Sequence, residues 1–109
     1  MSAVKVHGWV AVTQDFELMM ISALRYAIGR YTYMPSVTIG YIRYLIPQLS
    51  PNTLFVMKRD ISEEIGRHNR LHEENPQYFG KMYMAEEWKK LADEISTEYE
   101  KKKKKAVET

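Results

Sequence analysis

Proline and glycine divide this chain into segments, and the apolar residues between them recur at helical spacing. Gly29 is placed to close the first segment, Pro47 ends the second, and Ser50 with Pro51 opens the third. Glycine readily adopts the left-handed conformation that closes a helix, and proline is tolerated only in the first turn. Further breaks follow within residues 75–80. This punctuation predicts a series of helices and leaves little room for a sheet.

A six-residue connection separates the first two predicted helices. The first helix opens at Gln14 or Asp15, where acidic residues suit the helix dipole, and it ends before the connection at residues 30–35. After this connection, Ser36 is expected to cap a second helix over residues 37–46. The inward face of the first helix is expected to hold Phe16, Met20, Ala23, Leu24 and Ala27.

The second half of the chain is predicted to contain two more helices joined by a polar passage. The third helix starts at Pro51 and stops at Gly66, and the polar passage follows over residues 67–81. The last helix starts near Ala85 and frays into a lysine run at residues 101–105. Their inward faces are expected to hold Leu54, Met57, Ile61 and Ile65 in the third helix and Trp88, Leu91, Ala92, Ile95 and Tyr99 in the last.

The first residues of the chain follow a different pattern, because apolar side chains alternate at every second position. Valines fall on one side of a predicted strand that runs from Val4 to Val12. A lone strand leaves its backbone hydrogen-bonding groups unpaired. Its partner is therefore either the short stretch at residues 31–33 or another copy of the chain, and both choices stay open.

These segments together predict a mainly α fold, a small single domain of about four helices with a short N-terminal β-strand. The domain is expected over residues 1–100, followed by a basic disordered tail over residues 101–109, where five lysines repel one another. The absence of cysteine excludes disulfides and thiolate metal sites and favours a reducing compartment. The start does not resemble a secretory signal, and no apolar segment is long enough to span a membrane. We therefore expect a soluble cytoplasmic protein with no membrane association.

An acid-free run from Leu18 to Arg59 is the clearest compositional anomaly of the chain. Within residues 25–44 it contains five of the eight tyrosines and three arginines. The charge is uneven over the whole chain. Residues 1–59 carry six basic and two acidic side chains, a net charge of +4, whereas residues 60–100 carry five basic and eleven acidic ones, a net charge of −6. This asymmetry favours a homo-oligomer, a dimer or larger, or two distinct binding faces.

The connection between the first two predicted helices combines the groups that an anionic ligand needs. Guanidinium groups and hydroxyls offer hydrogen-bond donors, and the start of the second helix adds unpaired backbone N–H groups and a favourable dipole. Tyr31 and Tyr33 can stack on a base or a nucleotide ring. The predicted ligand-binding residues are Arg25, Arg30, Tyr31, Thr32, Tyr33 and Ser36.

A structural interpretation of the same residues stays open. Arg30 lies where the helix dipole favours a cation, and Ser36 is an ordinary cap. The tyrosines can pack between helices with their hydroxyls in water. Packing is the stronger expectation for Tyr26, Tyr41 and Tyr44.

Neither a metal site nor an active site is expected. Glu64, His68 and His72 would share one helix face if the third helix continued beyond Gly66, and such residues can bind Zn²⁺ or Fe²⁺. Because that helix is expected to stop, solvated histidines are the stronger interpretation, and no cofactor is expected. The serines lack a nucleophile-elbow motif, and the chain has no phosphate-binding glycine-rich loop. We therefore expect a protein that is not an enzyme.

The segment DFELMMISALRYAIGRYTYMPS resembles the opening of small, mostly uncharacterised proteins encoded by phages and prophages. Those proteins carry an L-R-Y-A-x-G-R-x-T-Y run after an acidic and aromatic start, and the run stands here at residues 24–33. The similarity extends to residues 58–61 and Trp88, and it leaves out residues 1–13 and the lysine run. The resemblance implies a phage accessory protein and supplies no catalytic residue.

A phage accessory protein without catalytic motifs is expected to act by stoichiometric binding, with counter-defence in the host cytoplasm as its use. In the leading hypothesis, the surface around Arg25 and Arg30 sequesters an anionic small molecule such as a nucleotide signal. In the alternative, the same surface binds and blocks a host or phage protein, for example a defence effector. A third hypothesis is direct nucleic-acid binding, which would weaken steeply with salt.

Overall fold

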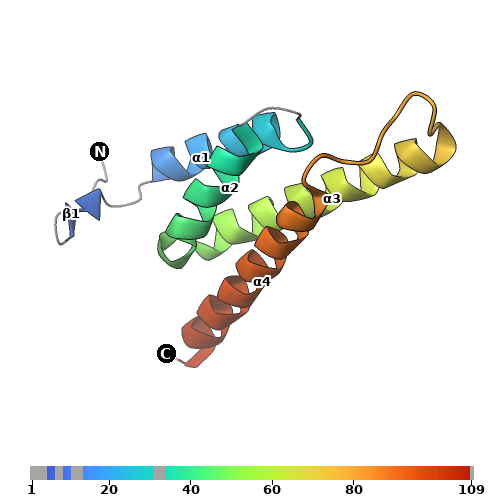
Figure 1. The fold of residues 1–109 in the computed structure, drawn as a ribbon. Coiled ribbons are helices and arrows are strands. Elements are labelled where there is room, and N and C mark those ends of the chain that lie inside the picture. The colour runs from blue at the N-terminus through green and yellow to red at the C-terminus, as the bar shows by residue number, and fades with distance from the viewer. Residues whose placement is uncertain (1–4, 7–8, 11–13, 31–33, 109) are drawn as a thin grey trace.

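The computed structural model describes residues 5–6, 9–10, 14–30 and 34–108, and its fold is mainly α, as predicted (Figure 1). The four helices of this part of the chain are α1 (Gln14–Ala27), α2 (Met34–Leu45), α3 (Pro51–Glu74) and α4 (Ala85–Glu108). A short 3₁₀ turn, η1 (Ile46–Gln48), links α2 to α3. Among these helices, none combines the length and apolar character needed to cross a membrane.

Two strands of two residues each precede the helices, β1 (Lys5–Val6) and β2 (Trp9–Val10). They pair antiparallel, with Lys5 opposite Val10 and Val6 opposite Trp9. The remaining residues of the strand predicted over residues 4–12 lie outside the described residues, and so does one of its two possible partners, the stretch at residues 31–33.

The end of α1 matches its prediction, whereas the start of α2 does not. Gly29 follows α1 with a φ of +80°, the left-handed conformation expected of a closing glycine. The prediction that Ser36 caps α2 is wrong, because α2 already begins at Met34 and Ser36 lies in its first turn. Pro35 explains the earlier start, since proline has no N–H to satisfy and its fixed φ suits a first turn.

The third helix begins as predicted and ends later. The Ser50 hydroxyl accepts the Thr53 backbone N–H at 3.3 Å, so Ser50 is the N-cap. The predicted stop at Gly66 and the non-helical passage after it are wrong, because α3 continues to Glu74. A single glycine weakens a helix by only about 1 kcal/mol, which neighbouring contacts can offset. The helix ends where Pro76 prevents further winding, as the residue before a proline disfavours the helical conformation.

The last helix also exceeds its prediction, because residues 101–108 belong to α4 and do not form a disordered tail. Lysines near the C-terminus of a helix interact favourably with its dipole. Two of them have further contacts: the Lys102 ammonium donates to the Leu49 carbonyl, and the Lys103 ammonium lies 5.9 Å from the centre of the Tyr99 ring. These contacts anchor a segment that like-charge repulsion alone would disfavour.

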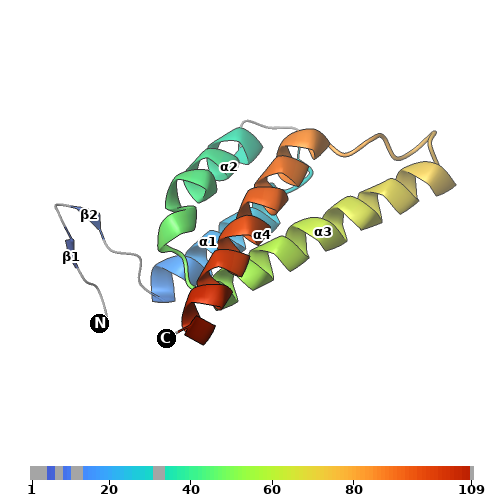
Figure 2. The same cartoon turned by 90° about the horizontal axis from the view of Figure 1, so that it is seen from below.

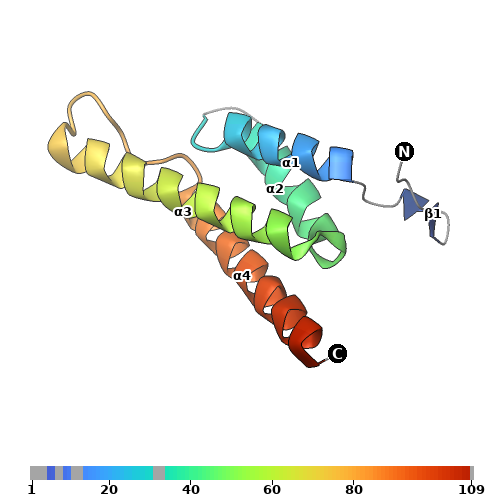
Figure 3. The same ribbon diagram turned by 180° about the vertical axis from the view of Figure 1, so that it is seen from behind.

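The four helices form an elongated body measuring 50 × 30 × 20 Å. The long helices α3 and α4 pack against each other, α1 lies on α3, and α2 lies on α4 (Figure 2). The last turns of α3 and the loop that follows extend away from the other helices (Figure 3). The C-terminal end of α1 lies near the middle of α3. The start of α2 lies near the start of α4.

The core lies where all four helices meet, and its largest residue is Trp88, which is fully buried. Most residues that were predicted to face inward do so. Those that are buried are Met20, Leu24, Ala27, Leu54, Met57, Ile61, Trp88, Leu91 and Ile95. Those that are partly buried are Phe16, Ala23, Ile65, Ala92 and Tyr99.

Candidate ligand-binding site

Several arginines of the acid-free run form ion pairs with carboxylates from the second half of the chain. Arg25 on α1 donates to Asp60 on α3 at 2.7 Å, and Arg43 on α2 donates to Glu94 on α4 at 2.8 Å. The hydrogen bond and the charge of Asp60 both raise the pKa of the Arg25 guanidinium above its ordinary value. The opposite charges of the two halves are therefore partly paired within one chain, and Arg25 already has an anionic partner.

Arg30 has a different environment, just beyond the end of α1. Its guanidinium carbon lies 4.1 Å from the centre of the Tyr26 ring, and its Nε donates to the Tyr26 carbonyl oxygen. Both side chains are exposed. Arg25, Arg43 and Arg59 each contact a carboxylate, so among the described residues Arg30 is the one arginine of the acid-free run that has no acidic partner. Its guanidinium is therefore exposed and has no counter-ion among the described residues.

The end of α1 packs closely against the middle of α3. A Cβ atom added to Gly29 would lie 2.7 Å from the Nε2 atom of His68, so only glycine fits there without displacement. His68 Nε2 in turn lies 3.6 Å from the carboxylate of Glu64, which also accepts from Arg67 at 2.8 Å. The hydrogen bond from Arg67 lowers the pKa of Glu64 below its ordinary value. The close packing of Gly29 against His68 therefore holds the backbone next to Arg30.

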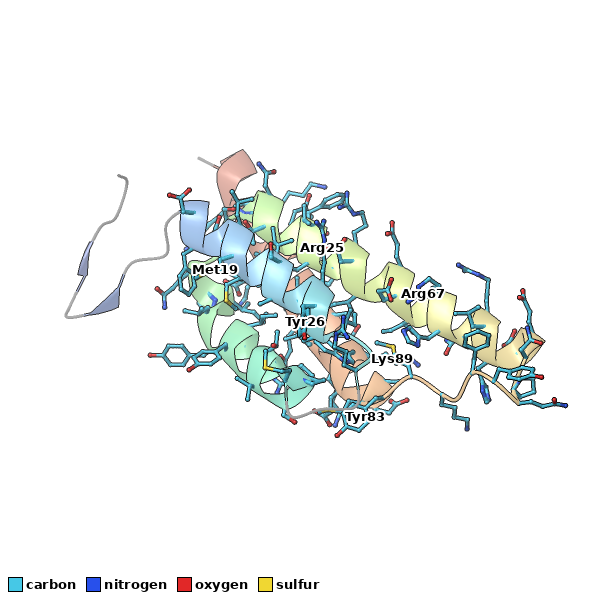
Figure 4. All side chains as sticks on the ribbon, turned by 90° about the horizontal axis from the view of Figure 1, so that it is seen from above. Met19, Arg25, Tyr26, Arg67, Tyr83 and Lys89 are labelled. Atoms are coloured by element: carbon cyan, nitrogen blue, oxygen red, sulfur yellow. The ribbon has the colours of Figure 1, made fainter. Side chains whose placement is uncertain are left out.

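Ser36 links α2 to α4 and makes no described contact with Arg30. Its hydroxyl donates to the Met84 sulfur at 3.6 Å. Met84 has a φ of 58°, a left-handed conformation that is uncommon outside glycine, and its carbonyl accepts the first helical N–H of α4, from Trp88, at 3.0 Å. Figure 4 shows Tyr83, just before the start of α4, and Lys89, near its beginning. Ser36 therefore has a structural role at this junction.

The three predicted site residues that the structure describes have separate environments. Arg25 is paired with Asp60, Arg30 lies on Tyr26, and Ser36 contacts Met84. The other three, Tyr31, Thr32 and Tyr33, lie outside the described residues.

Three tyrosines that were expected to pack between helices are exposed instead. The exposed fractions are 57% for Tyr26, 62% for Tyr41 and 70% for Tyr44. Tyr26 was expected to pack between helices, but its ring contacts Arg30 instead. The two residues are four positions apart, the spacing at which helical side chains meet. Tyr41 and Tyr44 lie with Val37 on the outer face of α2. These exposed rings widen the surface that is available for binding.

The possible metal ligands on α3 form other contacts. Because α3 continues past Gly66, Glu64, His68 and His72 do share one face of the helix. However, Glu64 is paired with Arg67, and His72 Nδ1 lies 2.8 Å from the Phe79 carbonyl oxygen. Within the described residues, no group of three or more histidine or acidic side chains is arranged to hold a metal ion.

Comparison of this chain with protein-family models, with curated proteins and with solved structures finds no match. These comparisons therefore give no function for this chain.

Proposed function

We propose that this protein acts by stoichiometric binding of an anionic small molecule that carries a planar ring, such as a nucleotide, at the end of α1. The observation that carries the proposal is the environment of Arg30, which is exposed, lies against Tyr26 and has no carboxylate partner among the described residues. The resemblance to phage accessory proteins makes counter-defence, by sequestering a nucleotide signal, the use that we propose for such binding.

The chemistry of Arg30 suits a phosphate. A guanidinium has five N–H donors in a planar fork, and only Nε is engaged with the Tyr26 carbonyl. The two terminal nitrogens donate to no described residue, so they can form the paired hydrogen bonds that arginine makes with phosphate oxygens. The contact with Tyr26 limits the freedom of the guanidinium before a ligand arrives, which lowers the entropy lost on binding.

Binding to a protein is the second candidate, favoured by the exposed aromatic side chains. Tyr26, Tyr41 and Tyr44 are each more than half exposed, and tyrosine with arginine is the combination enriched at the centres of protein interfaces. In this case the surface of α1 and α2 would bind and block a host or phage protein.

A thermal-shift comparison with a panel of nucleotides tests the first candidate. A ligand that binds only the folded state raises the melting temperature with its concentration. We expect a nucleotide to raise the melting temperature of the wild-type protein and of Arg70→Ala, but not that of Arg30→Ala. Arg70 is the matched control because it is an exposed arginine on the far turns of α3. An equal shift in Arg30→Ala would exclude this site.

A co-purification experiment tests the second candidate. Two results together would replace the first proposal with protein binding. No nucleotide would be released on denaturing the protein, and none would shift its melting temperature. One protein would be captured by the wild type and lost with Tyr26→Ser. Tyr78→Ser is the matched control, because Tyr78 is 80% exposed and lies after the far end of α3.

A further inference from the structure

We propose that the exposed stripe of α2, formed by Val37, Gly40, Tyr41 and Tyr44, is the contact surface of a symmetric dimer in which α2 packs against α2 of a second copy. This surface does not include Arg30, so the inference does not depend on ligand binding there. It shares Tyr41 and Tyr44 with the second candidate function, and a dimer would cover these two rings.

The stripe is a continuous face of one helix. Its residues follow at positions i, i+3, i+4 and i+7, which bring side chains together on one side of a helix. Val37 is 42% exposed, and the two tyrosines are more exposed still. The opposite side of α2 is already buried against the rest of the protein through Thr38, Ile39, Ile42 and Leu45. α2 therefore has apolar side chains on two faces. The exposed face has no packing partner among the described residues.

Within the described residues, no contact or backbone conformation accounts for a glycine at position 40. A Cβ atom added there would meet nothing within 4 Å, and its φ is not positive. Gly29, in contrast, needs both its positive φ and the space beside His68. A glycine in the interior of a helix is less stable than alanine at the same position, and its main structural benefit is to let another group approach the backbone closely. Gly40 therefore indicates that something packs against this stripe.

The pattern of the stripe is complementary to itself. In an antiparallel pair of α2 helices centred between residues 40 and 41, Gly40 of one copy faces Tyr41 of the other, and Val37 faces Tyr44. Each large ring then meets a smaller residue, and a two-fold axis repeats both contacts. This match of large with small side chains favours a second copy over an unrelated partner.

The charge distribution permits the pairing. Arg43 is the only charged residue of α2, and its guanidinium is held by Glu94 of α4 at 2.8 Å. The stripe itself is neutral, so a two-fold axis through it brings no like charges together. The tyrosine hydroxyls can stay in water at the rim, as is common for interface tyrosines. Because the stripe is short, the interface is at the small end of the known range, and we expect a dissociation constant of roughly micromolar order.

Sedimentation velocity over a concentration range that spans micromolar values tests the dimer. We expect the wild-type protein to change from the 12.9 kDa monomer to a species of twice that mass as its concentration rises. Gly40→Ala adds a methyl group against Tyr41 of the second copy, and Tyr44→Ser removes a ring from the contact. Because the two-fold axis makes each change occur twice in the contact, each is expected to weaken dimerisation by about tenfold or more.

Two controls make the outcome decisive. Gly66→Ala is the matched glycine variant, because its new methyl group would be in ordinary contact with Arg70 and away from α2, and it is expected to dimerise like the wild type. Arg30→Ala is expected to dimerise normally as well, so loss of the ligand site and loss of the dimer are separable. A wild type that is monomeric at every concentration, or a Gly40→Ala variant that dimerises as tightly as Gly66→Ala, would overturn the proposal.

Discussion

The carboxylate of Glu17, in the first turn of α1, accepts the backbone N–H of Ser50 at 2.7 Å and so closes the start of α3, which lies 33 residues further along the chain. Its second oxygen accepts the hydroxyls of Ser50 at 3.0 Å and Thr53 at 2.8 Å. Together with the Ser50 side chain, this carboxylate satisfies donors that the first turn of a helix leaves unpaired, and its charge suits the helix dipole. The contact is a polar link between α1 and α3, in addition to the Arg25–Asp60 ion pair.

Replacing Glu17 with alanine is expected to destabilise the protein by about 1–3 kcal/mol, because it leaves part-buried donors of Ser50 and Thr53 without an acceptor. Urea unfolding followed by circular dichroism measures the change. Asp15→Ala is the control, because Asp15 is an exposed acid in the same turn. Equal stability of the two variants would show that the Glu17 contact contributes nothing.

Glu64 is expected to contribute stability that depends on pH. Its pKa in the folded protein is lowered from 4.5, mainly by the hydrogen bond from Arg67. Below pH 4.5 the unfolded chain therefore binds more protons at this position than the folded one. The stabilisation is fully present above that pH and is lost as the pH falls through the folded pKa.

The comparison of Glu64→Gln with the wild type tests this dependence. The variant is expected to be less stable at pH 7 by up to about 1 kcal/mol, the usual range for a surface ion pair. The difference should shrink towards zero as the pH falls from 4.5 through the folded pKa. Glu63→Gln is the control on an exposed neighbouring position. A difference between Glu64→Gln and the wild type that stays constant with pH would contradict the prediction.

Gly29→Ala is expected to destabilise the protein by more than about 1 kcal/mol, since alanine in a left-handed conformation is strained. The new methyl group would also lie 2.7 Å from His68 Nε2 and force its ring to move. Gly66→Ala, where φ is not positive and the nearest atom is 3.6 Å away, is expected to stabilise α3 slightly. Thermal unfolding of both variants measures these opposite effects, and a Gly29→Ala variant as stable as the wild type would contradict the structure.

Lys102 is expected to hold the last turns of α4 in place. Its ammonium donates to the Leu49 carbonyl, and burial lowers its pKa below the ordinary value. Lys102→Ala removes the anchor, so the backbone amides of residues 101–105 should exchange with deuterium faster. Lys104→Ala, on an exposed position of the same turn, is the control. Unchanged exchange in Lys102→Ala would show that helix propensity and the dipole alone hold this end.

Features that depend on neighbours in the sequence were predictable. Ser50 was identified as a cap and Gly29 as a left-handed closing residue, because both act through backbone groups within a few residues. Two of the wrong predictions have a different cause. A local signal indicated a stop at Gly66 and disorder after residue 100, whereas contacts with other parts of the chain, such as that of Lys102 with Leu49, favour helix. The helical spacing of Tyr26, Tyr41 and Tyr44 did not indicate whether they face the core.

By itself, the sequence determined the number of helices, most of their starts and most inward-facing residues of α1, α3 and α4, since apolar periodicity and capping are local properties that each segment carries with it. Only the tertiary structure decided what happens to the charges of the acid-free run. Asp60 and Glu94 are 35 and 51 positions away from Arg25 and Arg43. Folding brings these pairs together and leaves Arg30 on Tyr26 without a described carboxylate. Of the broad cationic segment, the structure therefore leaves one arginine as the candidate for binding an anion.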